Sequence, residues 1–184
     1  MSIFKIEINA NLVRRILFEG DQLLERIIFD GQEKAAFWDE NNWSIDNPKI
    51  KETNFINLGN SGALVFDQKV YNSDLYAILE RAGEILPIKI KTQTYYALNI
   101  LNVVNCLDKT LTQWEYYDNG SPFRINKYHF KTKKMSASLL FKIPERNKTE
   151  IFCYSLPENP EKQFYAMYQK LKFTGLNFEE IYSE

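Results

Sequence analysis

Alternating apolar and polar residues predict strands along much of this chain. In residues 86–91, Ile88 and Ile90 alternate with Lys89 and Lys91, which is the period-two pattern of a strand with one buried face. Other short segments are rich in Ile, Leu, Val and Phe and end near turn-forming residues. We therefore expect further strands at residues 3–8, 12–18, 24–29, 137–143, 150–156 and 176–182.

Two longer segments show the spacing of an amphipathic helix. The first covers residues 67–82, with Asp67 or Ser73 available as the N-cap and Gly83 placed for a left-handed C-terminal cap. The apolar residues of its predicted face are Tyr71, Leu75, Ile78, Leu79 and Ala82.

The second predicted helix covers residues 160–173. Asn159 is a candidate N-cap, Pro160 suits the first helical position, and Gly175 is expected to end the helix. We expect its apolar stripe to pack into the core, and the stripe consists of Phe164, Met167, Tyr168 and Leu171.

The segment YYALNILNVVNCLDK, residues 95–109, carries no charge before Asp108. As a strand it is apolar on both faces, which is typical of a central strand that is covered on both sides. As a helix it would gather Asn99, Asn102, Asn105 and Asp108 on one arc. Its β-branched and aromatic residues favour a strand over residues 95–107, with a helix as the alternative.

These elements predict an α+β fold with a largely antiparallel sheet and two main helices, at about residues 67–82 and 160–173. The reason is that strands and helices do not alternate regularly along the chain. The length of 184 residues fits a single domain that spans residues 1–184. Residues 38–49 are predicted to form a loop.

Charge and composition narrow the classes of partner. The formal net charge of −1 removes the electrostatic preference for nucleic acid that a strongly basic chain would have. The longest uncharged run, residues 92–107, is too short to span a bilayer, and residues 1–20 lack the apolar centre of a signal peptide. The two cysteines have no histidines near them and predict no zinc site. We expect a cytoplasmic protein with no cofactor, no nucleic-acid partner and no membrane partner.

Residues 30–46, called the acidic segment below, combine negative charge with two tryptophans. Lys34 is the single base of this segment, and Trp38 and Trp43 lie within it. Aromatic anchors beside complementary charge are typical of surfaces that bind other proteins. The five acidic residues are Asp30, Glu33, Asp39, Glu40 and Asp46.

Residues 121–138 have the opposite charge, with five basic residues and no acidic one. Phe123, Tyr128 and Phe130 are interleaved with the bases, a pattern that also suits single-stranded nucleic acid. Along residues 127–133, however, the aromatic residues alternate with lysines and His129. We therefore expect Tyr128 and Phe130 in the core and the lysines in water.

Cys106, Asp108 and His129 are the residues from which a nucleophilic site could be built, and His129 is the chain's single histidine. A catalytic thiol needs an adjacent base and a third group that orients the base. Cys106 lies among apolar residues, which raise the pKa of a thiol, and His129 lies between lysines. Catalysis by these three residues is the least favoured of the functions considered.

Three features in the last two-thirds of the chain resemble a known family. The first is SGALVFDQKVYNSDLYAILERAG, the second is YYALNILNVVNCLDK, and the third is a pair of strands, a helix and the terminal TGLNFEEI. In this order they are similar to immunity-protein family 11 of bacterial polymorphic toxin systems, over about residues 58–184, while residues 1–57 are less distinctive. The matching residues, which we interpret as fold residues, are Leu98, Leu107, Phe141, Gly175, Leu176 and Phe178.

The resemblance implies a cytoplasmic, non-catalytic protein that binds and neutralises a cognate protein toxin, and it transfers no catalytic or binding residue to this sequence. From charge and aromatic content we assign the toxin-binding surface to the acidic segment, because a basic toxin would complement it. The assigned residues are Trp38, Asp39, Glu40, Trp43 and Asp46. The alternative function is that of a self-associating structural protein, and a homo-oligomer is compatible with the aromatic content of 15%.

Overall fold

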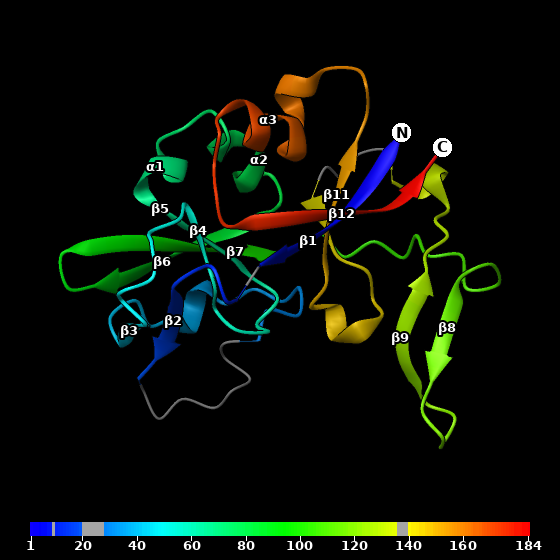
Figure 1. Ribbon diagram of the computed structural model, residues 1–184, viewed down its shortest axis with the longest axis horizontal. Helices are drawn as coiled ribbons and strands as arrows, with labels where there is room; N and C mark the ends of the chain where they lie inside the picture. The colour runs from blue at the N-terminus through cyan, green and yellow to red at the C-terminus, as the bar shows by residue number, and fades with distance from the viewer. Residues whose placement is uncertain (9, 20–27, 136–139) are drawn as a thin grey trace.

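Two four-stranded antiparallel sheets organise the fold of the computed structural model, which describes residues 1–8, 10–19, 28–135 and 140–184 (Figure 1). The first sheet has the order β10 (Leu140–Phe141), β11 (Ile151–Ser155), β1 (Ser2–Ile8) and β12 (Leu176–Ser183). The second has the order β4 (Phe55–Ile56), β5 (Leu64–Asp67), β7 (Gln93–Ile100) and β6 (Gly83–Ile90).

Two antiparallel strand pairs and a few short helices complete the architecture. The pairs are β2 (Arg15–Phe18) with β3 (Trp43–Asp46), and β8 (Gln113–Tyr116) with β9 (Pro122–Lys127). The α-helices are α1 (Gln68–Tyr71), α2 (Tyr76–Glu80) and α3 (Phe164–Lys170). The 3-10 turns are η2 (Ala35–Phe37), η3 (Thr132–Lys134), η4 (Arg146–Lys148) and η5 (Pro160–Lys162). The predicted α+β class with largely antiparallel sheets is confirmed.

Both sheets turn one face toward the helices, which lie together on one side of the molecule (Figure 1). Apolar residues of α1, α2 and α3 join residues of both sheets in one core cluster that includes Phe66, Leu98 and Cys153. On its other face, the second sheet packs against β3 and Phe29. The opposite face of the first sheet packs against Cys106, Tyr128 and other residues of the 104–135 region.

The first predicted helix, residues 67–82, is broken in the structure into α1 and α2. Asp67 does cap α1, because its carboxylate accepts a hydrogen bond from the amide of Val70 at 2.9 Å. The break follows at Ser73, whose hydroxyl donates to the Val70 carbonyl and accepts from the Leu75 amide. Such local side-chain bonds compete with a continuous helix. Gly83 begins β6 instead of capping a helix, and a Cβ there would lie 1.9 Å from the Asn99 carbonyl oxygen.

The second predicted helix, residues 160–173, is also shorter than expected. Gln163 has an extended backbone and separates η5 from α3. Its side-chain oxygen accepts a hydrogen bond from the Leu156 amide, and its side-chain nitrogen donates to the Leu156 carbonyl. After α3, the backbone first takes a positive φ at Lys172, with φ of 55°, and Gly175, three residues later, has φ of 108°. Gly175 passes close to β4, where a Cβ would lie 2.2 Å from the Phe55 carbonyl oxygen.

The segment 95–107 is a strand only as far as Ile100. Over that part it is the central strand β7, with Tyr95 and Ala97 on one buried face and Tyr96 and Leu98 on the other, so the two-sided apolar pattern is confirmed. Beyond Ile100 the chain is irregular apart from the isolated bridges at Val103 and Leu107.

Several strand boundaries also differ from the predictions. The loop predicted at residues 38–49 contains β3, and the strand predicted at 12–18 begins at Arg15. The strands predicted at 24–29 and 137–143 lie partly outside the described residues, and the described part of the second is β10. Among the described residues, no helix has the length and apolar character needed to cross a membrane.

Candidate functional site

The acidic segment lies against the second sheet and contains η2 and β3. Its tryptophans hold it there. Trp43 is buried, and Trp38 is half-buried, and their rings stack with centroids 5.2 Å apart. The indole N–H of Trp38 donates to the Pro87 carbonyl at 2.6 Å, and that of Trp43 donates to the Asp39 carbonyl at 2.7 Å. Both rings therefore anchor the segment to its own protein.

The carboxylates of the acidic segment remain nearer the surface. Glu40 forms an ion pair with Lys89 at 2.6 Å, and Asp46 lies half-buried beside Arg15 in the β2–β3 register. The Asp39 carboxylate accepts from the Asn41 amide at 2.9 Å and from the Asn42 side chain, and these hydrogen bonds lower the pKa of Asp39. The assigned surface residues are thus brought together, with their charges outward and their indoles inward.

Glu84 fixes the beginning of this segment, a role that the sequence analysis missed. Its carboxylate accepts from the amides of Lys34 and Ala35, at 2.8 and 3.1 Å, and from the side chain of Asn99 at 2.7 Å. These three donors come from two parts of the chain. The signal in the sequence is weak, because Glu84 looks like an ordinary polar residue at the start of a strand.

Lys142 is a second residue that the sequence analysis missed, and it is fully buried. Its ammonium group donates to the carbonyl of Phe29, just before the acidic segment. Burial lowers the pKa of Lys142 to about 8, with Asp30 opposing this shift and Lys34 adding to it. A lysine between apolar residues in the sequence LLFKIP is the signal that could have indicated a buried amine.

The structure brings Cys106, Asp108 and His129 onto neighbouring backbone segments but not into a catalytic arrangement. The Asp108 amide donates to the His129 carbonyl at 2.7 Å. In the part of the chain that the structure describes, no side-chain hydrogen bond joins any two of the three. Burial raises the pKa of the Cys106 thiol to about 12, while the Asp108 carboxylate accepts from the amides of Thr110 and Leu111. A thiol in this state is a poor nucleophile.

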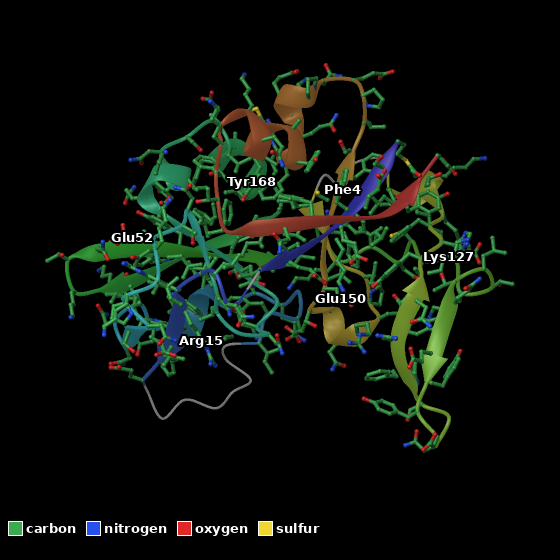
Figure 2. All side chains as sticks on the ribbon, viewed as in Figure 1. Phe4, Arg15, Glu52, Lys127, Glu150 and Tyr168 are labelled. Atoms are coloured by element: carbon green, nitrogen blue, oxygen red, sulfur yellow. The ribbon has the colours of Figure 1, made fainter. Side chains whose placement is uncertain are left out.

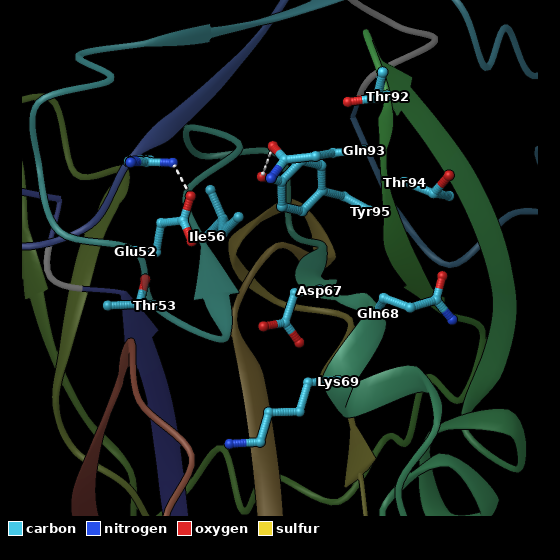
Figure 3. A pocket seen from close by; sticks show the side chains of 11 residues that line it. Glu52, Thr53, Ile56, Asp67, Gln68, Lys69, Thr92, Gln93, Thr94 and Tyr95 are labelled. Atoms are coloured by element: carbon cyan, nitrogen blue, oxygen red, sulfur yellow. Dashed lines mark hydrogen bonds and ion pairs between the residues drawn. The ribbon is translucent and has the colours of Figure 1, made fainter.

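A polar cleft of about 380 Å³ opens beside α1 (Figure 3). Arg14, Asp67 and the β6–β7 turn contribute to its lining. Its charged groups already have protein partners: Arg14 pairs with Glu52 at 2.6 Å, and Asp67 accepts from Asn54 at 2.9 Å. The remaining charged group of the lining, Lys69, has its ammonium 6.0 Å from the centre of the Phe173 ring. These residues do not assign a reaction to the cleft.

In the basic segment, residues 121–138, the aromatic and basic side chains follow the predicted division between core and surface only in part. Tyr128 and Phe130 are buried, and Lys127 and Lys131 are exposed, which confirms the expected alternation. Phe123, in contrast, is exposed on the β8–β9 hairpin, which extends from the rest of the molecule in Figure 1. Residues 136–138 lie outside the described residues.

Comparison with protein-family models and with curated proteins gives no match for this chain. Four of the six residues that we interpreted as fold residues lie in the core, and Gly175 and Phe178 are half-buried. Leu98, Leu107, Phe141 and Leu176 are buried. They shape the fold, so any functional surface has to be sought elsewhere.

Proposed function

We propose that this protein is a non-catalytic immunity protein that binds a cognate bacterial toxin and neutralises it in a stoichiometric complex. The resemblance over residues 58–184 supports this proposal, together with one structural observation. That observation is the acidic segment, in which a buried indole, Trp43, and a half-buried one, Trp38, hold the neighbouring carboxylates against the second sheet.

A fixed acidic surface suits an inhibitor of a basic toxin. Opposite charges on two proteins raise the association rate and orient the encounter. Because Trp43 is buried, the toxin would meet the carboxylates of Asp39, Glu40 and Asp46 and the outer edge of Trp38. Side chains already held in place lose little conformational freedom on binding.

The test begins with the gene neighbourhood, where we expect an open reading frame with a variable C-terminal toxin domain immediately upstream, and continues with co-expression of that domain and this protein. We expect this protein to protect the cells and to co-purify with the toxin domain in a 1:1 complex. Failure to protect, with both proteins present, would contradict the proposed function for that pair.

The surface is tested separately, with purified proteins at low salt. The variant Asp39→Asn, Glu40→Gln, Asp46→Asn is expected to associate with the toxin about tenfold more slowly. A matched control neutralises three exposed acids elsewhere, in Glu158→Gln, Glu161→Gln, Glu179→Gln. If both variants associate equally fast, the toxin binds another surface.

A further inference from the structure

The β8–β9 hairpin, residues 113–127, called the arm below, carries an apolar stripe that extends beyond the core. At its base, Trp114 and Ile125 are opposite each other in the strand register and pack on the core cluster. Farther out, Tyr117 and Phe123 contact each other with centroids 4.7 Å apart, yet they are 55% and 37% exposed. Tyr116 is 58% exposed. In Figure 2 the side chains at the end of the arm extend away from the body of the molecule.

Backbone hydrogen bonds close the turn at the end of the arm. The Tyr117 amide donates to the Ser121 carbonyl, and the Gly120 amide donates back to the Tyr117 carbonyl, each at 2.9 Å. Gly120 has φ of +78°, which suits glycine in such a turn. Arg146 of the body also donates to the Phe123 carbonyl. Exposed aromatic rings on a rigid turn are well suited to binding, because little ordering remains to be done.

The charge around the arm indicates an acidic partner. Residues 109–134 contain six basic and two acidic residues, although the whole chain has a net charge of −1. Lys127, Lys133 and Lys134 form no ion pair within the described residues, and Figure 2 shows Lys127 at the end of β9. Glu115, near the exposed rings, is ion-paired with Arg124 at 2.6 Å, so the excess positive charge around the arm comes from these lysines.

The acidic segment of this same chain has the complementary properties. Phe37 in η2 is 48% exposed and is flanked in sequence by Glu33, Asp39 and Glu40. Figure 1 places the β2–β3 pair and the arm toward opposite ends of the long axis, so one copy does not dock its arm on its own acidic segment. A second copy can provide an acidic segment for the arm of the first copy.

We propose that the arm of one copy docks on the acidic segment of a second copy, with Tyr117 and Phe123 against Phe37 and lysines against carboxylates. The two surfaces differ, so the contact is heterologous. Two copies form a closed dimer if they exchange arms reciprocally, and they form longer assemblies if they do not.

Sedimentation of the purified protein over a wide range of concentrations tests this proposal without any toxin. We expect the weight-average mass to rise with protein concentration and to fall when salt is added, because salt screens charges at the surface. The arm variant Tyr117→Ser, Phe123→Ser and the segment variant Phe37→Ser are each expected to weaken association about tenfold or more. Leu156→Ser, at another exposed apolar position, should associate like the wild type.

Mixing the two variants tests the heterologous geometry. The arm variant keeps an intact acidic segment and the segment variant keeps an intact arm, so the mixture should form a one-to-one dimer that neither variant forms alone. A mixture that stays monomeric, when the wild type associates, would overturn the assignment. Self-association of the segment variant alone at wild-type strength would show arm-on-arm contact instead. A wild-type protein that is monomeric at every concentration would overturn the proposal altogether.

Two charge variants test the same contact in case the aromatic variants fail to fold. Lys127→Glu and Glu33→Lys keep all aromatic rings and alter exposed side chains. Each should weaken association at low salt and match the wild type more closely at high salt. Association of both at wild-type strength in low salt would contradict the role of charge. Since no toxin is present, none of these results depends on the proposed immunity function.

Discussion

The acidic segment and the arm contain the same kinds of residue, aromatic side chains next to charged ones, but the structure places their rings differently. In the acidic segment, Trp38 and Trp43 stack on each other and each indole N–H donates to a backbone carbonyl. In the arm, the Tyr117 and Phe123 rings contact each other at a tilt of 54° near the end of a hairpin and remain exposed. Composition alone does not distinguish an anchor from a contact residue.

The difference comes from what lies beneath each segment. The acidic segment runs along a sheet that offers both an apolar face and a free carbonyl at Pro87, so its large rings can be buried with their N–H groups bonded. The arm continues past the edge of the core that covers Trp114 and Ile125. Aromatic side chains that have a sheet face beneath them are buried, and those that extend past the core remain exposed and free to bind.

The largest effect that would sharpen this comparison is expected at Trp43. Trp43→Ala removes a buried ring that contacts Phe18 and Trp38, and it leaves a cavity. We expect a loss of about 3–5 kcal/mol in the free energy of unfolding. Chemical denaturation measures it, with Phe37→Ala as the control from the same segment, where a loss below about 1 kcal/mol is expected because the ring is half exposed. Equal losses would show that the tryptophan does not anchor the segment.

A smaller effect, dependent on pH, is expected at Lys142, which ties the start of the acidic segment to β10 through the Phe29 carbonyl. Its folded-state pKa is lowered from 10.5 to about 8. Between these two pH values the unfolded chain holds a proton that the folded protein does not, so stability rises with pH in this window. The gain over the whole window is about 3 kcal/mol.

The variant Lys142→Met isolates this contribution. Unfolding free energies of the wild type and the variant are compared from pH 7 to pH 10.5. Other groups that titrate in this range, such as the buried tyrosines, are common to both proteins and cancel in the difference. We expect the wild type to gain stability relative to the variant as pH rises from about 8 to 10.5. Parallel pH profiles would show that the Lys142 amine is not buried as described.

The sequence predicts those parts of the fold in which apolar and polar residues repeat with a regular period. The alternation at Ile88 and Ile90 and the two apolar faces of β7 identify buried strands correctly. The helices are shorter than predicted because single side chains, at Ser73 and Gln163, bond to nearby backbone groups and interrupt them. Such bonds depend on which carbonyl lies within reach, and periodicity carries no information about that.

The candidate site shows the same division. The sequence groups Asp39, Glu40 and Asp46 because they lie close along the chain. It does not show that the indoles point inward, since their acceptors include Pro87, which lies 49 residues from Trp38. Glu84 acts across a similar separation, on the amides of Lys34 and Ala35, and Lys142 acts on Phe29 across 113 residues. Contacts between distant segments decide the role of each of these residues.

The smallest effect on stability is expected at the end of the arm. The variant Tyr117→Ala, Phe123→Ala removes two exposed rings that contact each other. We expect the free energy of unfolding to fall by less than about 1 kcal/mol at a protein concentration where the chain is monomeric. The matched control at the base, Trp114→Ala, removes a ring packed on the core and should cost more. If the two losses are equal, the rings at the end of the arm stabilise the monomer as the base does. If the loss at the end is small and self-association is abolished, their exposure serves binding.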